Sequence, residues 1–438
     1  MKRSVKAGIV IGAIALVAIG AEVYRTVTRI PLQTVAPAQV RQPLVIWAWD
    51  DTVMKSGAAY EQVRPDVALH FVAVDADAYT ERLKIALATF FEVPDICTLE
   101  KDSRAELLQL NIWENLENEP YSISSLQIPN YMRSSVTAPD GSIAAIPYDI
   151  SVSGVAYRKS LAERLLGDAS PAAVQAAFPS WEAVIANGGA LKAAHPDFFL
   201  FASPQDIADI LMNQTEAAYV QNGVLVDPAR FLGMFETVAQ LRHLGLIDQV
   251  EKWSPSWYNS FPSKQYLFYP CAIWTMQYRV FSGKNDRGET DWGLAIPPGG
   301  SFSWGGTAWS ICKFSQKKEL AFDYLSWFLL SEEGAIFNKE KLNGVFIHYM
   351  PIYNDPSYMD LYHEDFGDVN VGNFYFKELF PAMKKREIGM YDQKINHFFK
   401  LVCQALVDSP QMTAAQARDI FIDRLLEEVP QLTVPDFE

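Results

Sequence analysis

Apolar runs alternate with amphipathic segments directly after position 43. The runs at 44–48, 67–74 and 94–99 are mostly apolar and are followed by charged residues, which is typical of strands buried in a parallel sheet. Before the last run, Leu83 and Leu87 recur at helical spacing. The order strand–helix–strand–helix–strand predicts right-handed crossovers and therefore a doubly wound α/β lobe.

The remainder of the chain predicts a further set of elements. Segment 160–243 is mostly helical in its periodicity, and an aromatic strand is expected at 266–269. A Pro/Gly loop then carries Trp304-Gly305-Gly306 between two short strands. Ser315 and Ser331 can cap the two helices that follow this loop. A chain of 438 residues is too long for one simple core, so we expect two lobes.

Charge and composition exclude several classes of protein. The net charge of −15 argues against nucleic acid or an anionic membrane as the main partner. The six histidines lack metal-binding spacing, and we expect no metal and no cofactor. The four cysteines lie far apart, and three disulfide pairings remain open. Cys97 and Cys312 lie in apolar runs, where a buried thiol is expected.

The N-terminus has the features of a targeting segment. Lys2, Arg3 and Lys6 precede the uncharged run from Ala7 to Ala21. As a helix this run would be roughly 22 Å long, short of the roughly 30 Å hydrocarbon core of a membrane. We predict that residues 1–21 are a signal peptide, with an uncleaved N-terminal anchor as the alternative. In both cases the body of the protein is exported, to the periplasm or the outer face of the cytoplasmic membrane.

Residues 22–42 are expected to be a linker, because they contain Thr, Gln and two prolines. A second connecting segment is expected at 146–159, where Pro147 stiffens the start of an extended strand. This segment falls where an α/β lobe of about one hundred residues would close. A plain edge strand after a turn is the alternative.

The order of these features resembles the bacterial extracellular solute-binding proteins of family 1, the maltose-binding-like sugar receptors of ABC importers. Pro147, Tyr148, Tyr157 and Lys159 match the family's crossing segment, and the Gly-Gly loop with its two helices is the most specific match. The resemblance covers roughly residues 43–345. It implies a two-lobed, type II periplasmic-binding-protein fold with a ligand cleft between lobes that hinge segments join.

The resemblance also implies a division of the chain. We expect the first lobe to hold residues 43–148 and about 285–312, and the second lobe to hold 149–284 and about 313–438. The tail from 349 onwards either caps a lobe or lines the cleft. Near the expected ligand, Lys264-Gln265 and Cys271-Ala272 stand where relatives commonly have glycine. Because glycine permits close approach to the backbone, this departure indicates an atypical ligand.

Candidate ligand-binding residues lie where strands are expected to end, because ligands of this class bind between lobes. Carboxylates and backbone N–H groups can bond sugar hydroxyls, and aromatic faces can cover the C–H face of a sugar ring. Asp50 or Asp51 can alternatively cap a helix, and residues 100–102 can be a solvated loop. The candidates are Trp47, Trp49, Asp50, Asp51, Glu100, Asp102, Tyr148, Asp149, Trp257, Tyr258, Trp274, Trp304, Gly305 and Gly306.

The resemblance implies a monomeric receptor that delivers a carbohydrate, in particular an oligosaccharide, to an ABC permease. An exported carbohydrate-active enzyme is an alternative, with carboxylates from Asp50/Asp51 and Glu100/Asp102 facing each other across a cleft. No nucleophile elbow, metal spacing or phosphate loop is present, so we expect no enzymatic activity. A membrane-anchored sensor, or the same fold with a ligand that is not a sugar, also remains open.

Overall fold

The computed structural model describes residues 43–123, 128–278, 281, 290–342 and 344–435. The predicted signal peptide or anchor and the linker lie outside these residues. None of the helices among the described residues is long and apolar enough to cross a membrane.

The first lobe is built on a sheet in the order β2-β1-β3-β12-β4. Its strands are β1 (Leu44–Ala48), β2 (Leu69–Ala73), β3 (Ile96–Glu100), β4 (Ile146–Pro147) and β12 (Thr307–Ile311). The strand β1 runs parallel to β2 and β3, whereas β12 is antiparallel to β3 and β4. This sheet confirms the three strands and the doubly wound arrangement predicted from the apolar runs.

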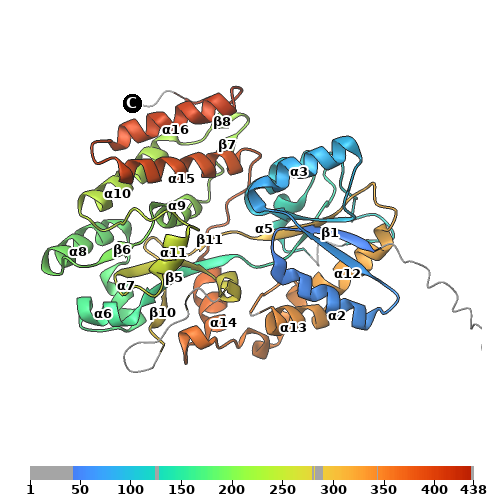
Figure 1. The fold of residues 1–438 in the computed structure, drawn as a ribbon, viewed down its shortest axis with the longest axis horizontal. Helices are drawn as coiled ribbons and strands as arrows, with labels where there is room; N and C mark the ends of the chain where they lie inside the picture. Colours follow the sequence, from blue (N-terminus) through green and yellow to red (C-terminus); the bar gives the residue numbers. More distant parts are fainter. Residues whose placement is uncertain (1–42, 124–127, 279–280, 282–289, 343, 436–438) are drawn as a thin grey trace, which may run out of the picture. The chain divides into compact units, whose positions relative to one another are not determined.

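Helices cover the first sheet, and Figure 1 shows α2 and α3 on opposite sides of β1. The helices of this lobe are α2 (Lys55–Val63), α3 (Ala76–Thr89), α4 (Lys101–Leu108), α5 (Asn130–Arg133), α12 (Lys318–Leu329) and α13 (Glu332–Lys341). Ser331 caps α13 as expected, since its side chain accepts from the N–H of Gly334. Ser315 instead bonds the Asp95 carboxylate, and α12 begins only at Lys318.

The second lobe is built on a sheet in the order β10-β5-β9-β6, with β11 also paired to β5. Its strands are β5 (Val152–Arg158), β6 (Phe199–Phe201), β9 (Tyr266–Ala272), β10 (Trp292–Ala295) and β11 (Phe302–Ser303), and a separate hairpin is formed by β7 (Val220–Gln221) and β8 (Val224–Leu225). Every residue of β5 and β9 is buried. These two antiparallel strands are therefore the centre of the second core.

The helices of the second lobe include most of the C-terminal tail, and Figure 1 shows α15 and α16 beside α10. They are α6 (Lys159–Leu166), α7 (Pro171–Ala177), α8 (Trp181–Ala194), α9 (Pro204–Asn213), α10 (Pro228–His243), α11 (Pro255–Ser260), α15 (Asp392–Asp408) and α16 (Ala414–Glu428). Short helical turns complete the chain: η1 (Asp51–Met54), η2 (Ser134–Val136), η3 (Ile273–Tyr278), η4 (Met350–Asn354), η5 (Pro356–Met359), η6 (Glu364–Phe366), α14 (Val371–Asn373), the π-helical η7 (Phe374–Leu379) and η8 (Phe380–Ala382).

Three connections lie between the lobes in the described part of the chain. Two of them join the sheets, since residues 148–151 lead from β4 to β5 and residues 304–306 lead from β11 to β12. The third, residues 383–391, comes after η7, which packs on β5, and leads into α15. The first connection lies beside residues 346–348, because the N–H of Ile150 donates to the carbonyl of Phe346 at 2.8 Å. The expected crossing after Pro147 is therefore present in the structure.

The division of elements differs from the expected one at two places. The strands β10 and β11 lie within 285–312 but pair with β5 in the second sheet, and only β12 returns to the first. The helices α12 and α13 lie after residue 313, yet α12 packs on β12 and α2 of the first lobe. A short antiparallel strand can pair at the edge of either sheet. The local sequence does not specify which sheet it joins, so the assignment of β10 and β11 could not be predicted.

All four cysteines are buried free thiols in the structure. The expected burial of Cys97 and Cys312 is confirmed. Burial raises the pKa of the Cys271 thiol to about 12, so this group is protonated at neutral pH.

Candidate functional site

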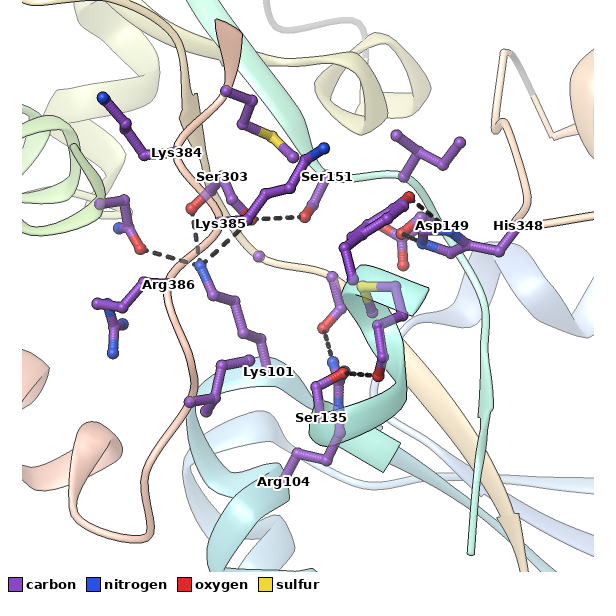
Figure 2. Close-up of a pocket in the computed structure, with 18 of the residues that line it drawn as sticks. Lys101, Arg104, Ser135, Asp149, Ser151, Ser303, His348, Lys384, Lys385 and Arg386 are labelled. Atoms are coloured by element: carbon purple, nitrogen blue, oxygen red, sulfur yellow. Dashed lines mark hydrogen bonds between the residues drawn. The ribbon is translucent and has the colours of Figure 1, made fainter. Parts of the chain in front are cut away.

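A cavity lies where the three connections pass between the sheets (Figure 2). The first lobe contributes α4 and residues 131–135, the second contributes Asn213 at the end of α9, and residues of all three connections complete the wall. The cavity is partly open to solvent, and its volume is about 60 Å³. This is room for a few water molecules.

Lys101 is the first residue of α4, and its side chain joins the two lobes. The ammonium Nζ donates to Oδ1 of Asn213 at 2.9 Å and to the carbonyl of Ser303 at 2.7 Å, and Figure 2 shows Lys101 reaching toward Ser303. The residue is 7% exposed. Burial lowers the pKa of this ammonium to about 8, because a charge is poorly solvated there.

Arg104 lies one helical turn after Lys101, so both side chains leave the same face of α4. Its guanidinium donates to the carbonyl of Gly306 at 2.6 Å and to Ser135 Oγ at 3.4 Å. The residue is 1% exposed, and burial lowers the pKa of its guanidinium. Among the described residues, neither Lys101 nor Arg104 has a carboxylate within the 4.0 Å of a salt bridge.

Of the described residues that line the cavity, Asp149 is the one that is acidic. Its Oδ1 accepts from the N–H of Thr307 at 2.8 Å, and burial raises the pKa of the carboxyl to about 6. The backbone carbonyl of Asp149 lies 3.1 Å from Nε2 of His348. Burial lowers the pKa of His348 to about 3, so the ring is neutral at neutral pH. Since a carbonyl only accepts, Nε2 carries the proton and Nδ1 accepts from the Tyr131 hydroxyl at 3.0 Å.

The third connection brings three consecutive cations to the cavity (Figure 2). Lys384 pairs with Glu216 at 3.4 Å, and Arg386 forms an ion pair with Asp392. Lys385 is exposed, and its Nζ lies 4.7 Å from the centroid of the Tyr131 ring. The described part of the lining is strongly cationic, in a chain whose net charge is −15. It holds one acidic residue, Asp149, and five cationic ones: Lys101, Arg104, Lys384, Lys385 and Arg386.

An aromatic cluster adjoins the cavity through Trp304. The indole of Trp274 donates from Nε1 to the carbonyl of Trp304 at 2.8 Å, and the two ring centroids are 4.8 Å apart. Trp253 stacks on Trp304 with centroids 6.1 Å apart. These three rings and Trp257 line a second small cavity. Trp253 is 50% exposed, whereas Trp304 and Trp257 are buried, so Trp253 offers the accessible ring face.

Buried ion pairs support the aromatic cluster from below. The ammonium of Lys252 lies 4.1 Å from the centroid of the Trp304 ring and pairs with Asp206 at 2.9 Å and Asp209 at 2.6 Å. Lys400 of α15 pairs with the other oxygen of Asp209 at 2.6 Å. The network fixes Lys252 against Trp304, which gives the loop a rigid base.

The loop 304–307 connects the sites that the sequence predicted. Trp304 lines the aromatic cavity, Gly305 and Gly306 line the central one, and Thr307 lines a third cavity beside Trp49, Asp50 and Tyr148. The predicted residues Asp149, Gly305 and Gly306 therefore meet at the centre. Trp257 and Trp274 lie in the adjoining cluster, and Tyr258 is 47% exposed next to Trp253.

Other predicted residues lie elsewhere. Trp47 is 1% exposed in the first core, and Asp51 begins η1. Glu100 caps α4 by accepting from the N–H of Asp102 at 2.7 Å, and burial raises the pKa of its carboxyl to about 7. Neither Glu100 nor Asp102 lines the central cavity. The sequence-based selection instead missed the residues that do: Lys101, Arg104, Tyr131, Asn213, Ser303, His348 and 384–386.

The sequence matches a known protein family. Residues 55–338 match the family model of the bacterial extracellular solute-binding proteins. No curated protein matches the sequence.

Solved structures share the fold. A crystal structure of an extracellular solute-binding protein of family 1 is similar with a TM-score of 0.76 and 20% identity, over 88% of this chain and 99% of that one. The GacH receptor of Streptomyces glaucescens, solved unliganded and with acarbose, has a TM-score of 0.70 and 16% identity over 89% of this chain and 98% of its own. The galacto-N-biose/lacto-N-biose I-binding protein of Bifidobacterium longum has a TM-score of 0.70 and 15% identity over 90% and 99%.

Proposed function

This chain belongs to the bacterial extracellular solute-binding proteins, and from that membership we propose that it is an exported receptor that captures a carbohydrate between its lobes for an ABC importer. The observation that carries the proposal is the loop 304–307, which places an aromatic cluster and a polar cavity on either side of two glycines. Similar solved proteins were crystallised with acarbose and with lacto-N-biose, which supports a saccharide as the ligand.

The side chains match the two faces of a sugar. The exposed face of Trp253 and the nearby Tyr258 can cover C–H groups, each contact adding about 0.5–1.5 kcal/mol beyond area burial. Asp149, Asn213 and Ser303 line the adjoining cavity and can bond hydroxyls. A saccharide of two or more rings could therefore contact the aromatic cluster and the central cavity together.

Capture requires that the lobes open and close. Lys101 bonds the second lobe directly, so opening breaks its contacts with Asn213 and Ser303. A ligand that bonds both lobes replaces these contacts and shifts the population to the closed form. The closed form would then dock on the permease, with residues 1–21 directing export and the receptor acting as a monomer.

A catalytic function has less support. Hydrolysis of a glycosidic bond, with inversion or retention at the anomeric carbon, needs two carboxylates that face each other across the cleft. Of the described residues that line the central cavity, only Asp149 is acidic, and Glu100 is occupied as a helix cap. We therefore propose binding without turnover.

Thermal-shift screening against mono- and oligosaccharides tests the proposal. A ligand at one hundred times its dissociation constant stabilises by about 2.7 kcal/mol, which is readily detected. We expect a shift with at least one saccharide. A shift with amino acids, polyamines or peptides and with no saccharide would replace the carbohydrate by another solute.

Trp253→Ala is the matching site variant. Removal of the exposed ring should weaken the binding of that saccharide about three- to tenfold in calorimetry, and leave the melting temperature nearly unchanged. Tyr362→Ala is the control, because Tyr362 is 63% exposed and lines none of the three cavities. Equal affinities of the two variants would remove the aromatic cluster from the site.

A further inference from the structure

We infer that the ligand carries an anionic oxygen group, a carboxylate or a phosphate, which Lys101 and Arg104 receive in the central cavity. The inference rests on the proposed carbohydrate function and specifies the class of saccharide as acidic. It starts from the cationic lining of the cavity, which stands out in a chain with a net charge of −15.

The five cations differ in what already neutralises them. Arg386 pairs with Asp392 and Lys384 pairs with Glu216, so their charges have partners within the protein. Lys101 and Arg104 bond only neutral oxygens: an amide, backbone carbonyls and serine hydroxyls. Lys101 and Arg104 are therefore two buried cations of the lining that have no carboxylate of the described residues within salt-bridge distance, although Glu100 and Asp102 act on both from further away.

Burial of an unpaired charge is costly, and a ligand anion offsets this cost. Charge-assisted hydrogen bonds from ammonium and guanidinium to a carboxylate or phosphate are about twice as strong as neutral ones. A neutral hydroxyl would only replace the neutral partners that Lys101 and Arg104 already have. The gain from binding at these two side chains is therefore largest for an anion.

The placement of the two cations fits one compact anionic group. Both side chains leave one face of α4, three residues apart, and both line the same cavity. The cavity volume of about 60 Å³ accommodates a group of a few atoms rather than a whole sugar. The ring that carries the group would extend toward the aromatic cluster when the lobes open.

Lys385 supplies an approach path for an anion. Its ammonium is exposed at the edge of the cavity, over the Tyr131 ring, and makes no ion pair among the described residues. A surface cation beside a cleft raises the local concentration of anions, an effect that salt screens. Lys385→Gln should therefore slow association and leave the fold intact.

Calorimetry with matched saccharides tests the inference. It uses the full chain, at pH 7 and constant ionic strength. The pairs are digalacturonate against galactobiose, and galactose 6-phosphate against galactose. We expect one anionic probe to bind about tenfold or more tightly than its neutral partner. The uronate pair reports a carboxylate and the phosphate pair reports a phosphate.

Lys101→Gln and Arg104→Gln should each weaken binding of the anionic probe about tenfold or more, and change the affinity for the neutral partner far less. Lys101→Arg keeps the charge and should retain most of the preference. Thermal melting of each ligand-free variant verifies folding. Lys385→Gln is a further variant at an exposed position, where the substitution does not disturb the core. A neutral probe that binds as tightly as its anionic partner, or no binding of any anionic probe, overturns the inference.

The outcomes separate this inference from the proposed function. Tight binding of galactobiose or galactose, without any preference for the charged probes, would support the carbohydrate receptor and contradict an anionic group on the ligand. Binding of inorganic phosphate or of a dicarboxylate, with no saccharide bound, keeps the anion site and removes the carbohydrate.

Discussion

The charge of Lys101 is set by groups on several elements. Burial lowers the pKa of its ammonium to about 8, the carboxylates of Asp102, Glu100 and Asp392 raise it, and Arg386 lowers it. Half of the ammonium is therefore deprotonated near pH 8 in the free protein, whereas an unfolded lysine stays charged to about pH 10. The positive charge that Lys101 brings to the cavity therefore depends on pH.

This dependence predicts how affinity for an acidic saccharide changes with pH. The bound anion requires the protonated ammonium, so its affinity should fall as pH rises through 8, by up to about tenfold per pH unit. Calorimetry between pH 7.5 and 9.5 measures the change, a range in which Asp149 and Glu100, with pKa values of about 6 and about 7, are largely ionised.

Lys101→Arg is the control for the pH profile, because a guanidinium stays charged across this range. The variant should give a flat profile. A wild-type affinity that does not change between pH 7.5 and 9.5 would show that the ammonium of Lys101 does not touch the anion.

At the scale of elements, the loop between β11 and β12 depends on its glycines. Gly306 has a φ of +107°, and a Cβ there would lie 3.0 Å from Ser151 Oγ. Its carbonyl also accepts from Arg104, so the loop position and the guanidinium position are linked. A side chain at Gly306 would disturb the backbone and the cavity together.

Gly306→Ala should therefore lower stability by about 1–3 kcal/mol and also weaken ligand binding. Gly300→Ala separates the two effects, because Gly300 has a similar φ of +102° with open space around a Cβ. That variant should lose stability from backbone strain alone and bind normally. Denaturant unfolding measures the stability of each variant, and calorimetry measures its affinity for the ligand. Equal affinities for the two variants would show that the contact between the Gly306 carbonyl and Arg104 does not affect ligand binding.

The same elements show what the sequence could predict. The strands at 44–48 and 96–100 were predictable because buried parallel strands are apolar runs. The strand at 69–73 lies at the edge of the sheet and has no fully buried residue, but its apolar residues still indicated a strand. The ligand-binding site was less predictable than the strands. The sequence analysis chose the acidic residues 100 and 102 as candidates and did not choose Lys101, which lies between them. Which of the three side chains lines the cavity depends on where α4 begins, and Glu100 is its N-cap. The cations at 384–386 reach the cavity through the tertiary fold, from far along the chain.

At the scale of the whole described chain, Lys101 is also a link between the lobes. Its hydrogen bonds to Asn213 and Ser303 span the cavity, and we expect the connections between the sheets to act as the hinge about which the lobes rotate. In the ligand-free protein these bonds favour the arrangement in which the two lobes meet at the cavity. A ligand must therefore compete with Lys101 for its partners or recruit its ammonium.

Lys101→Ala should shift the ligand-free protein toward open forms, which spin labels on the two lobes can measure. Glu81→Cys on α3 and Glu236→Cys on α10 provide exposed attachment sites. The four native cysteines are buried, so unmodified protein serves as the labelling control. With Lys101 present, the distance distribution should be dominated by one population. Its removal should broaden the distribution, because the lobes lose the hydrogen bonds that span the cavity. An unchanged distribution would mean that other contacts hold the lobes together and that Lys101 acts on the ligand alone.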